Sequence, residues 1–363
     1  MLTYNHESYI EEAIKSVLNQ TYKNWELIIV DNASTDKTRQ IIEQLTQKDS
    51  RIKFFPQIRN LYVSHGINTA LKYCKGEYIA LLSGDDYFKQ TKLELQLEYM
   101  ITKKLDLSFT WINVVNEKSE KDSQGTEDWL NDSTIKTSND IVRSYFHMNN
   151  KTCAPTALIK STVLNNMKLH DHRLLQIQDL ELWIRILQQT QNVEILHIPL
   201  TNYRISSDGS NLSSQNSLAK ENRTVFEMMS IYEQLFLLDD KIISDIFDVE
   251  ITSENKHQRL YEIFENNNAH ILQYTSLIKM FEKLGPECDT SSPLFQFFFQ
   301  KYSEIGITDI NIVKKQTKMI DQRDSSIKEQ TEMIDQKDSY IKELETKYDY
   351  LVKNRFNIFK RRL

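Results

Sequence analysis

The sequence predicts an α/β fold, in which a Rossmann-like domain with a mainly parallel sheet is followed by a helical region and a C-terminal coiled coil. Three observations support this prediction. Apolar strands alternate with amphipathic helices in the first half, the pattern becomes helical from about residue 217, and a heptad repeat occupies the end of the chain. Strands separated by helices of this length imply parallel pairing through βαβ crossovers.

The first elements follow directly after Met1. Ser8 and Glu11 are expected to form a capping box at the start of a helix, because an apolar face follows them at helical spacing. Residues Trp25 to Val30 predict a buried strand that ends at Asp31. Asp36 is then placed to cap a second helix.

Two more strand and helix pairs complete the first part. Residues 54–55 are both phenylalanine and indicate a strand, which is followed by a helix near Ser64 to Tyr73. Residues Tyr78 to Leu82 are strongly apolar and predict another strand, which the polar run Gly84 to Asp86 ends. A helix is expected from about Gln90. Ligands of such sheets bind beyond the carboxyl ends of the strands.

Composition excludes several function classes. The formal net charge is −6, so nothing in the overall charge favours nucleic-acid binding. Only seven residues are glycine, and no glycine-rich phosphate loop occurs. The three cysteines are far apart, which fits a reducing compartment. No signal peptide is evident and no apolar run reaches the roughly 18 residues of a membrane span, so a cytoplasmic location is expected.

The end of the chain carries a duplication. Residues 316–329 are repeated almost without change by residues 330–343, which amounts to two heptads each. Apolar residues recur every seven positions at Val313, Ile320, Ile327, Ile334 and Ile341. The second seam is polar, so we expect a weak coiled coil that forms a homo-oligomer or needs a partner helix. The basic, aromatic tail at 354–363 predicts contact with an anionic membrane. A solvated single helix with a disordered basic end is the alternative.

Two adjacent carboxylates, Asp85 and Asp86, follow the most apolar strand. Such a pair repels unless a cation is shared, and oxygen-rich sites of this kind suit Mg²⁺ or Mn²⁺ held with substrate phosphates. A plain polar turn explains the same residues, because Gly-Asp-Asp is good turn chemistry. Asp31 carries the same ambiguity.

Five sequence blocks in order resemble family 2 glycosyltransferases over about residues 1–215. They are Leu2 to Glu7 with Ser16 to Tyr22, Glu26 to Asp36, Gly76 to Asp86, Gln178 to Arg185, and Tyr203-Arg204. The resemblance implies a GT-A fold and transfer from a nucleotide-sugar donor, often a UDP-sugar, with inversion at the anomeric carbon.

The resemblance also implies roles for single residues. Thr3, Tyr4 and Glu7 would line the nucleotide pocket, Asp31 would accept a hydrogen bond from the base, and Asp85 would bind Mn²⁺ or Mg²⁺ with Asp86 beside it. Asp179 would be the catalytic base, although its position equally fits a helix N-cap. Glu181 is a second candidate for the base. Arg204 would meet the phosphates or be a surface arginine.

The sequence departs from this family pattern twice. Ser83 stands where the first acid of the metal-binding motif is expected. The family's first strand normally precedes the Leu2 block, so either translation starts upstream of Met1 or most of a central strand is lacking. The expected domains are 1–215 (GT-A), 216–310 (helical region), 311–353 (coiled coil) and 354–363 (tail).

These features predict a metal-dependent, inverting glycosyltransferase that extends a cell-surface glycan. Its partners would be a nucleotide sugar and a glycan or glycolipid acceptor, and it would work in the cytoplasm, at the inner face of the membrane if the tail binds lipid. A sugar nucleotidyltransferase is one alternative, but it normally carries a glycine-rich N-terminal loop. A non-catalytic scaffold with a degenerate transferase domain is the other.

Overall fold

The computed structural model describes residues 1–304 except 122–125, 148, 166, 168–169, 172, 207–217, 267–269, 286–288 and 290. The chain divides into two compact units, residues 1–295 and 296–363. The second unit is described only as far as Glu304. The predicted coiled coil and basic tail therefore lie outside the described residues.

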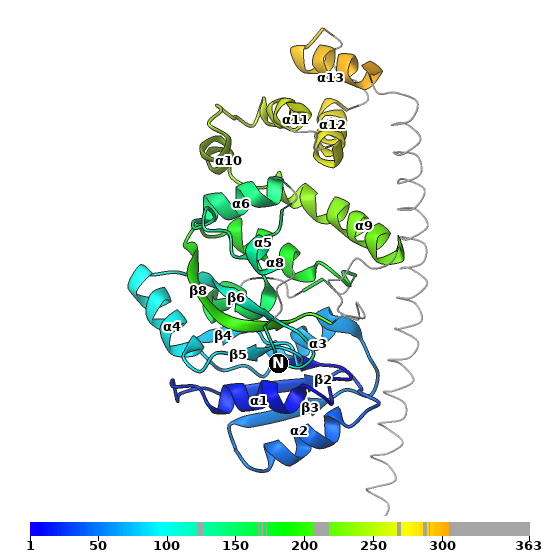
Figure 1. Cartoon of the computed structure of the whole chain (residues 1–363). Coiled ribbons are helices and arrows are strands. Elements are labelled where there is room, and N and C mark those ends of the chain that lie inside the picture. The colour runs from blue at the N-terminus through cyan, green and yellow to red at the C-terminus, as the bar shows by residue number, and fades with distance from the viewer. Residues whose placement is uncertain are drawn as a thin grey trace, which may run out of the picture. The chain divides into compact units, whose positions relative to one another are not determined.

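The first sheet is parallel, as predicted, and has the order β1-β2-β3. Its strands are β1 (Leu2–Thr3), β2 (Leu27–Asp31) and β3 (Ile52–Pro56), and its helices are α1 (Ile10–Leu18), α2 (Thr38–Thr46) and α3 (Tyr62–Leu71) (Figure 1). Side chains of β2 alternate between two clusters: Leu27 and Ile29 pack with α1 and α2, whereas Ile28 and Val30 pack with Ala70 of α3. Helices therefore cover both faces of this sheet, as expected of βαβ units.

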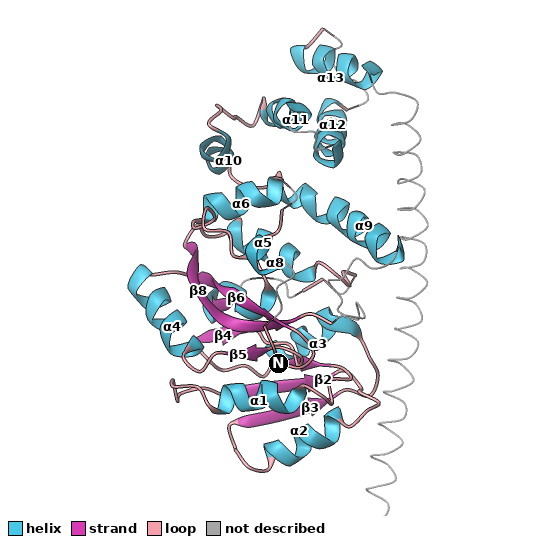
Figure 2. Cartoon of the chain, viewed as in Figure 1, coloured by secondary structure: helices cyan, strands magenta, loops and turns pink. Residues whose placement is uncertain are grey.

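The second sheet is mixed and has the order β4-β7-β6-β8-β5 (Figure 2). Its strands are β4 (Tyr78–Ala80), β5 (Tyr87–Phe88), β6 (Leu107–Val115), β7 (Leu158–Lys160) and β8 (Val193–Arg204). Only β6 and β8 pair in parallel, and their register shifts around Trp111. The other three pairs are antiparallel. The expectation of a mainly parallel sheet therefore describes the first sheet and not the second.

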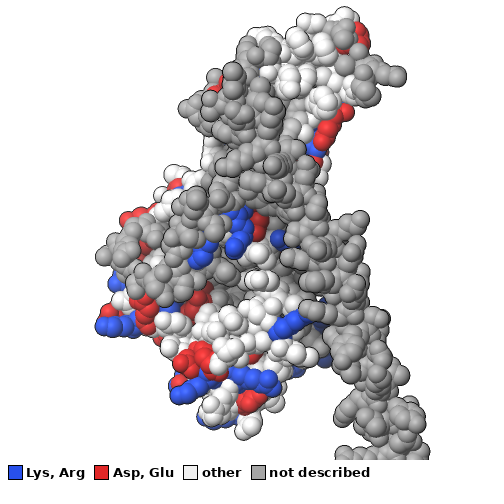
Figure 3. Space-filling view, turned by 90° about the vertical axis from the view of Figure 1, so that its right-hand side faces the viewer, with Lys and Arg blue, Asp and Glu red and all other residues white. Residues whose placement is uncertain are grey.

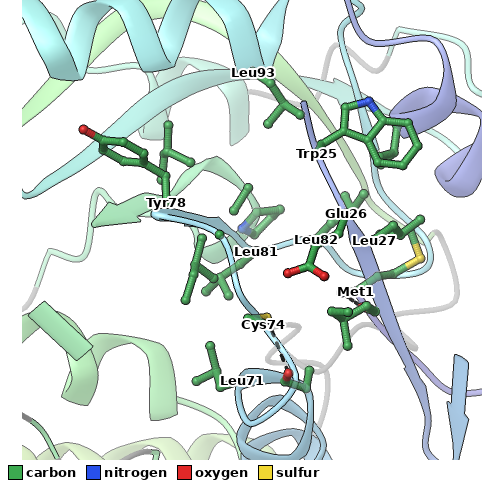
Figure 4. Close-up of a pocket in the computed structure, with 18 of the residues that line it drawn as sticks. Met1, Trp25, Glu26, Leu27, Leu71, Cys74, Tyr78, Leu81, Leu82 and Leu93 are labelled. Atoms are coloured by element: carbon green, nitrogen blue, oxygen red, sulfur yellow. Dashed lines mark hydrogen bonds between the residues drawn. The ribbon is translucent and has the colours of Figure 1, made fainter. Parts of the chain in front are cut away.

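Strand β1 joins the two sheets. The amide of Leu2 donates to the Leu82 carbonyl at 3.1 Å, and its own carbonyl accepts from Gly84 at 2.9 Å. On the other side, Leu2 pairs with Val30 of β2. A strand of two residues thus holds the central position, and an apolar cavity of about 700 Å³ lies beside Met1 (Figure 4). The cavity is lined by β2, α3 and β4, and it reaches Gln178 and Asp179.

Two expected helix caps differ from the structure. The N-cap of α1 is Tyr9 and no side chain caps it, so the capping box of Ser8 and Glu11 was wrong. Glu11 instead pairs with Lys15 one turn later, at 2.8 Å. The N-cap of α2 is Lys37, but Asp36 still accepts a hydrogen bond from the Thr38 amide at 2.9 Å.

Helices dominate the rest of the described chain. They are α4 (Lys92–Lys103), α5 (Thr126–Leu130), α6 (Ser138–Phe146), the 3-10 helix η1 (Ala154–Thr156), α7 (Ser161–Asn165), α8 (Gln178–Leu187), α9 (Leu218–Leu235), α10 (Asp240–Phe247), α11 (Lys256–Asn266), α12 (His270–Leu284) and α13 (Pro293–Glu304). No described helix is long and apolar enough to cross a bilayer. On the face shown in Figure 3, acidic and basic side chains lie beside one another.

The helical region expected from residue 216 is present, and its described apolar side chains share a core with the preceding residues. One hydrophobic cluster runs from Phe109 of β6 and Trp183 of α8 through Tyr232 of α9 to Leu272 of α12. The rings of Phe109 and Trp183 meet edge to face, with centroids 5.1 Å apart. Residues on both sides of the expected 215/216 boundary therefore bury apolar surface against each other.

Candidate functional site

The loops that follow β1 and β2 are bound to each other at the carboxyl edge of the first sheet. Asn5 donates its amide to the Ser34 hydroxyl and accepts from the Thr35 amide, at 2.9 and 2.8 Å. Glu7 accepts from the Lys37 amide at 2.8 Å. Glu7, predicted to line the nucleotide pocket, thus uses its carboxylate to bind the second loop.

The backbone is strained at three positions, two in these loops and one at the first residue of α3. Asn5, Ala33 and Tyr62, which follow β1, β2 and β3 respectively, have φ values of 55°, 63° and 63°. Positive φ is costly for alanine and tyrosine, and such strain persists where surrounding contacts enforce it, often at ligand sites. Here Asn32 supplies one contact, since its side-chain amide donates to the Tyr62 carbonyl at 2.9 Å.

Asp31 is the last residue of β2, at the carboxyl edge of the first sheet. Its side chain is only 1% exposed, and it accepts from the Ser34 hydroxyl and from the Ser34 amide. Burial raises the pKa of the Asp31 carboxyl, and the bonds from Ser34 partly oppose that shift. Thr3 beside it is buried, whereas Tyr4 is 41% exposed. Thr3 and Asp31 are adjacent because they pair across β1 and β2, and Tyr4 follows Thr3 in the chain.

The turn at Gly84 brings Asp85 against the loop after β1. A Cβ on Gly84 would lie 2.4 Å from Thr3 Oγ1 and 2.8 Å from His6 Nδ1, so glycine allows this approach. Asp85 Oδ2 lies 3.8 Å from His6 Nε2. The other oxygen, Oδ1, is buried and has no hydrogen-bond partner among the described residues. A buried carboxylate oxygen without a partner is costly unless a ligand supplies one.

Asp86 is buried in the protein, unlike its neighbour Asp85. Its carboxylate is 2% exposed and accepts from the Arg204 amide at 2.8 Å. Burial raises the pKa of Asp86 well above its usual range, and the neighbouring Asp85 carboxylate adds to the shift. This geometry favours Asp86 as a residue that fixes the turn, with Asp85 left facing the site.

Arg204, expected at the donor phosphates or on the surface, is buried and so is not a surface arginine. It is 2% exposed and donates to the Asp85 carbonyl at 2.8 Å, to the Asn116 carbonyl at 2.6 Å and to Glu12 at 2.7 Å. Its guanidinium also stacks over the Tyr9 ring, 4.4 Å from the centroid. The planar guanidinium of Arg204 therefore connects β8, α1 and the turn at Asp85 through its hydrogen bonds.

Asp179 occupies the first turn of α8 and is partly buried. It accepts from the Leu180 amide at 2.8 Å, but it does not cap the helix, whose N-cap is Ile177. Burial raises the pKa of its carboxyl to about 6, because the charge is poorly compensated there. A carboxyl with such a pKa is suited to accept a proton near neutral pH.

Glu181, the second candidate for the base, is fully engaged elsewhere. Its two oxygens accept from Arg185 at 2.6 and 2.8 Å, and Gln234 of α9 donates to it at 3.3 Å. The side chain is buried in this pairing. The geometry therefore favours Asp179 over Glu181 as a proton acceptor.

Cys153, just before η1, lies within electrostatic range of the predicted carboxylates. Burial raises the pKa of this thiol, and the carboxylates of Asp86, Asp179 and Asp85 each raise it further. Carboxylates from two distant parts of the sequence, 85–86 and 179, therefore act on the same thiol. Sequence reasoning missed Cys153 and His6; His6 could have been found, since it lies within the Leu2 to Glu7 block.

The same residues fit a divalent cation bound together with a diphosphate. No group of three or more His, Cys, Asp or Glu side chains in the described part of the chain is placed to hold a metal ion by itself. Asp85 nevertheless offers a buried oxygen without a partner. Mg²⁺ and Mn²⁺ sites of phosphate-transferring or phosphate-releasing enzymes commonly use one or two carboxylates and take the remaining ligands from phosphate and water.

Comparison with known proteins identifies relatives of this chain. The family described as "Glycosyl transferase family 2" matches residues 1–162. An uncharacterized glycosyltransferase of Methanocaldococcus jannaschii is 34% identical over 216 residues, which are 59% of this chain and 72% of the relative. The Escherichia coli UDP-Glc:alpha-D-GlcNAc-diphosphoundecaprenol beta-1,3-glucosyltransferase WfgD is 39% identical over 119 residues. The chain covers 46% of that relative, and the match spans 33% of the chain.

Solved structures resemble the fold as well. The complex of Staphylococcus aureus TarS residues 1–349 with UDP-GlcNAc superimposes with a TM-score of 0.54 at 17% identity. The match covers 78% of this chain and 90% of that protein. At this identity the likeness establishes the GT-A architecture alone.

Proposed function

Since this chain belongs to glycosyl transferase family 2, we propose that it moves a sugar from a nucleotide-sugar donor, most readily a UDP-sugar, to a hydroxyl group of a glycan acceptor, with inversion. The observation that carries the proposal is the pair of carboxylates left for chemistry: Asp85 has a buried oxygen without a hydrogen-bond partner among the described residues, and Asp179, beside the cavity, has a pKa raised to about 6. One carboxylate serves the donor phosphates and the other serves the acceptor hydroxyl.

The donor would bind across the carboxyl edge of the first sheet. Thr3, Tyr4 and Asp31 would hold the nucleoside, with Asp31 accepting a hydrogen bond from the base. The strained loops after β1, β2 and β3 support this placement, because their cross-links hold the pocket in one conformation before the donor arrives.

The diphosphate would lie at Asp85. Asp85 would hold Mn²⁺ or Mg²⁺, whose positive charge, when bound, would offset the negative charge that develops on the leaving diphosphate. Arg204 and Asp86 would keep the Asp85 backbone in place through the bonds described above. His6 lies next to Asp85 and would contribute to the same end of the pocket.

Asp179 would act as the base on the acceptor side. The acceptor oxygen attacks the anomeric carbon, the bond from that carbon to the diphosphate oxygen breaks, and the hydroxyl proton passes to the Asp179 carboxylate. Attack from the face opposite the leaving group inverts the configuration. Because the pKa is about 6, the carboxylate is ionised at neutral pH and is still a stronger base than an ordinary aspartate.

The acceptor is proposed to be a glycan or glycolipid of the cell surface. The printed name of the E. coli relative describes an acceptor linked to diphosphoundecaprenol, and this supports a lipid-linked acceptor for the present chain. The C-terminal segment would then serve assembly and membrane contact, with 311–353 pairing helices and 354–363 facing lipid phosphates.

A donor screen tests the proposal. Calorimetry with UDP-, GDP-, CMP- and dTDP-sugars in the presence of Mn²⁺ should identify one nucleotide that binds, and transfer assays should then release the nucleoside diphosphate. Asp85→Asn should lose metal-dependent binding, and Asp179→Asn should bind the donor without turnover. Binding of none of the four nucleotide classes would overturn the proposal.

A further inference from the structure

We propose that Glu227 of α9, in the helical region, is the positioning residue that holds the loop before α8 and thereby places Asp179 for proton transfer. The inference rests on the function proposed above. It gives helix α9, which lies outside the motifs of the first 215 residues, a role in positioning Asp179.

Glu227 receives three consecutive backbone amides. Leu175 donates to its Oε1 at 2.9 Å, and Gln176 and Ile177 donate to its Oε2 at 3.0 and 3.1 Å. The last of these, Ile177, is the N-cap of α8, and Asp179 follows two residues later. One side chain on α9 therefore fixes the backbone at which the catalytic helix begins.

The chemistry of this contact calls for a carboxylate. Successive amides that point to one spot form an anion-binding concavity, and the positive end of the α8 dipole adds to it. Glu227 is only 3% exposed, so its charge is compensated chiefly by these donors. An amide side chain would present its own NH₂ group toward at least one backbone N–H and leave that donor without an acceptor.

The other side of the same loop is bound to α3. Ser64 donates to the Leu174 carbonyl at 2.9 Å, and Asn68 exchanges two hydrogen bonds with the backbone of His170 at 2.8 and 2.9 Å. Because α3 packs on β1 and β2, this side of the loop is the one that faces the proposed donor pocket. The loop before α8 is thus bound to α3 on one side and to α9 on the other, and Glu227 fixes the end of the loop next to α8.

This arrangement gives the helical region a function in the transfer reaction. Residues of α9 also enter the core that contains α8. The Glu227 contact is different from that packing, because it acts on the few residues that orient Asp179. A purely structural residue would change the stability of the protein and leave the rate of the folded enzyme unaltered.

The test compares Glu227→Gln with Glu233→Gln in the full chain. Glu233 lies on the same helix but pairs with Lys279 of α12, so it is a matched control. Hydrogen exchange of residues 175–181, donor affinity and kcat are measured well below the melting temperature. We expect faster exchange and a kcat lower by about 10-fold to 100-fold for Glu227→Gln, with donor affinity within about twofold. Glu233→Gln should match the wild type in all three.

Several other results of this experiment would contradict the positioning role of Glu227. Unchanged exchange at 175–181, or faster exchange with an unchanged kcat, would overturn it. If Glu227→Gln does not fold, Glu227→Asp keeps the charge and should show intermediate exchange and rate; a wild-type kcat with faster exchange would again refute the positioning role. A wild type that transfers no sugar would defeat the proposed function, while the exchange data would still decide whether Glu227 anchors the loop.

Discussion

The buried charge of Asp179 should make the wild-type protein less stable above pH 6 than its Asp179→Asn variant. The pKa of this carboxyl is raised from 3.8 to about 6 in the folded state. A raised carboxyl pKa contributes stability that is fully present below the unfolded value of 3.8 and is lost as the pH rises through 6. The shift of about two units corresponds to about 3 kcal/mol.

Asparagine has nearly the same shape and does not titrate in this range. The free energy of unfolding of Asp179→Asn, relative to wild type, should therefore rise by up to about 3 kcal/mol between pH 4 and pH 8. For a unit of this size that difference corresponds to a melting temperature roughly 5 °C higher at pH 8. Differential scanning calorimetry at both pH values measures it, and transfer assays on the same samples should show almost no turnover.

The pH dependence of transfer is an independent test of the Asp179 carboxyl group. The wild-type kcat/KM should fall on the acid side with an apparent pKa near 6, because protonated Asp179 in the free enzyme cannot accept the acceptor proton. Glu181→Gln is the control, since it breaks a buried ion pair with Arg185 and should lower stability while transfer continues. An active Asp179→Asn variant beside an inactive Glu181→Gln variant would refute the assignment, and so would a pH-independent stability difference.

Three further expectations follow from the site and the chain end. Asp85→Asn should abolish Mn²⁺-dependent donor binding in calorimetry at an unchanged melting temperature, and full activity in excess chelator would contradict the metal role. Arg204→Met should cost about 3 to 5 kcal/mol in denaturant unfolding, because Glu12 and the Asp85 turn lose their buried partner; a loss below about 1 kcal/mol would mean that the contacts are dispensable. A chain that ends at Ile310 should sediment as a smaller species than the full chain, and vesicle flotation should require residues 354–363; monomers in both cases and no flotation would remove both roles.

The parts predictable from sequence were those in which neighbours along the chain determine the structure. The strand at Leu27–Asp31, the turn at Gly84 and the start of α8 near Asp179 all appeared close to where their patterns placed them. The capping box at Ser8 failed because the first turn is closed by backbone bonds from Tyr9 and Ile10 to the His6 carbonyl.

What sequence reasoning missed depends on contacts between distant segments. Arg204 looked available because nothing local pairs with it, yet its partners are residues 12, 85 and 116. The second sheet was unforeseen because β6, β7 and β8 are brought together across about ninety residues, with no hairpin signal between them. Glu227 had no motif at all, since its three donors are backbone amides fifty residues away.

The buried carboxylates fall into two groups. Some have partners that neutralise them and stabilise the fold, and others lack such partners and are available for catalysis. Glu181 is balanced by Arg185, and Glu227 by three amides, so amide substitution at either should lower the free energy of unfolding at pH 8 by about 1 to 3 kcal/mol. Asp85 has an oxygen without a partner and Asp179 has a raised pKa, so these two carboxylates are less fully paired than Glu181 and Glu227. Substituting these two by asparagine should therefore leave stability unchanged or increase it at pH 8, while transfer is lost. Denaturant unfolding of the four variants measures the division, and a destabilised Asp85→Asn would show that this carboxylate, too, serves the fold.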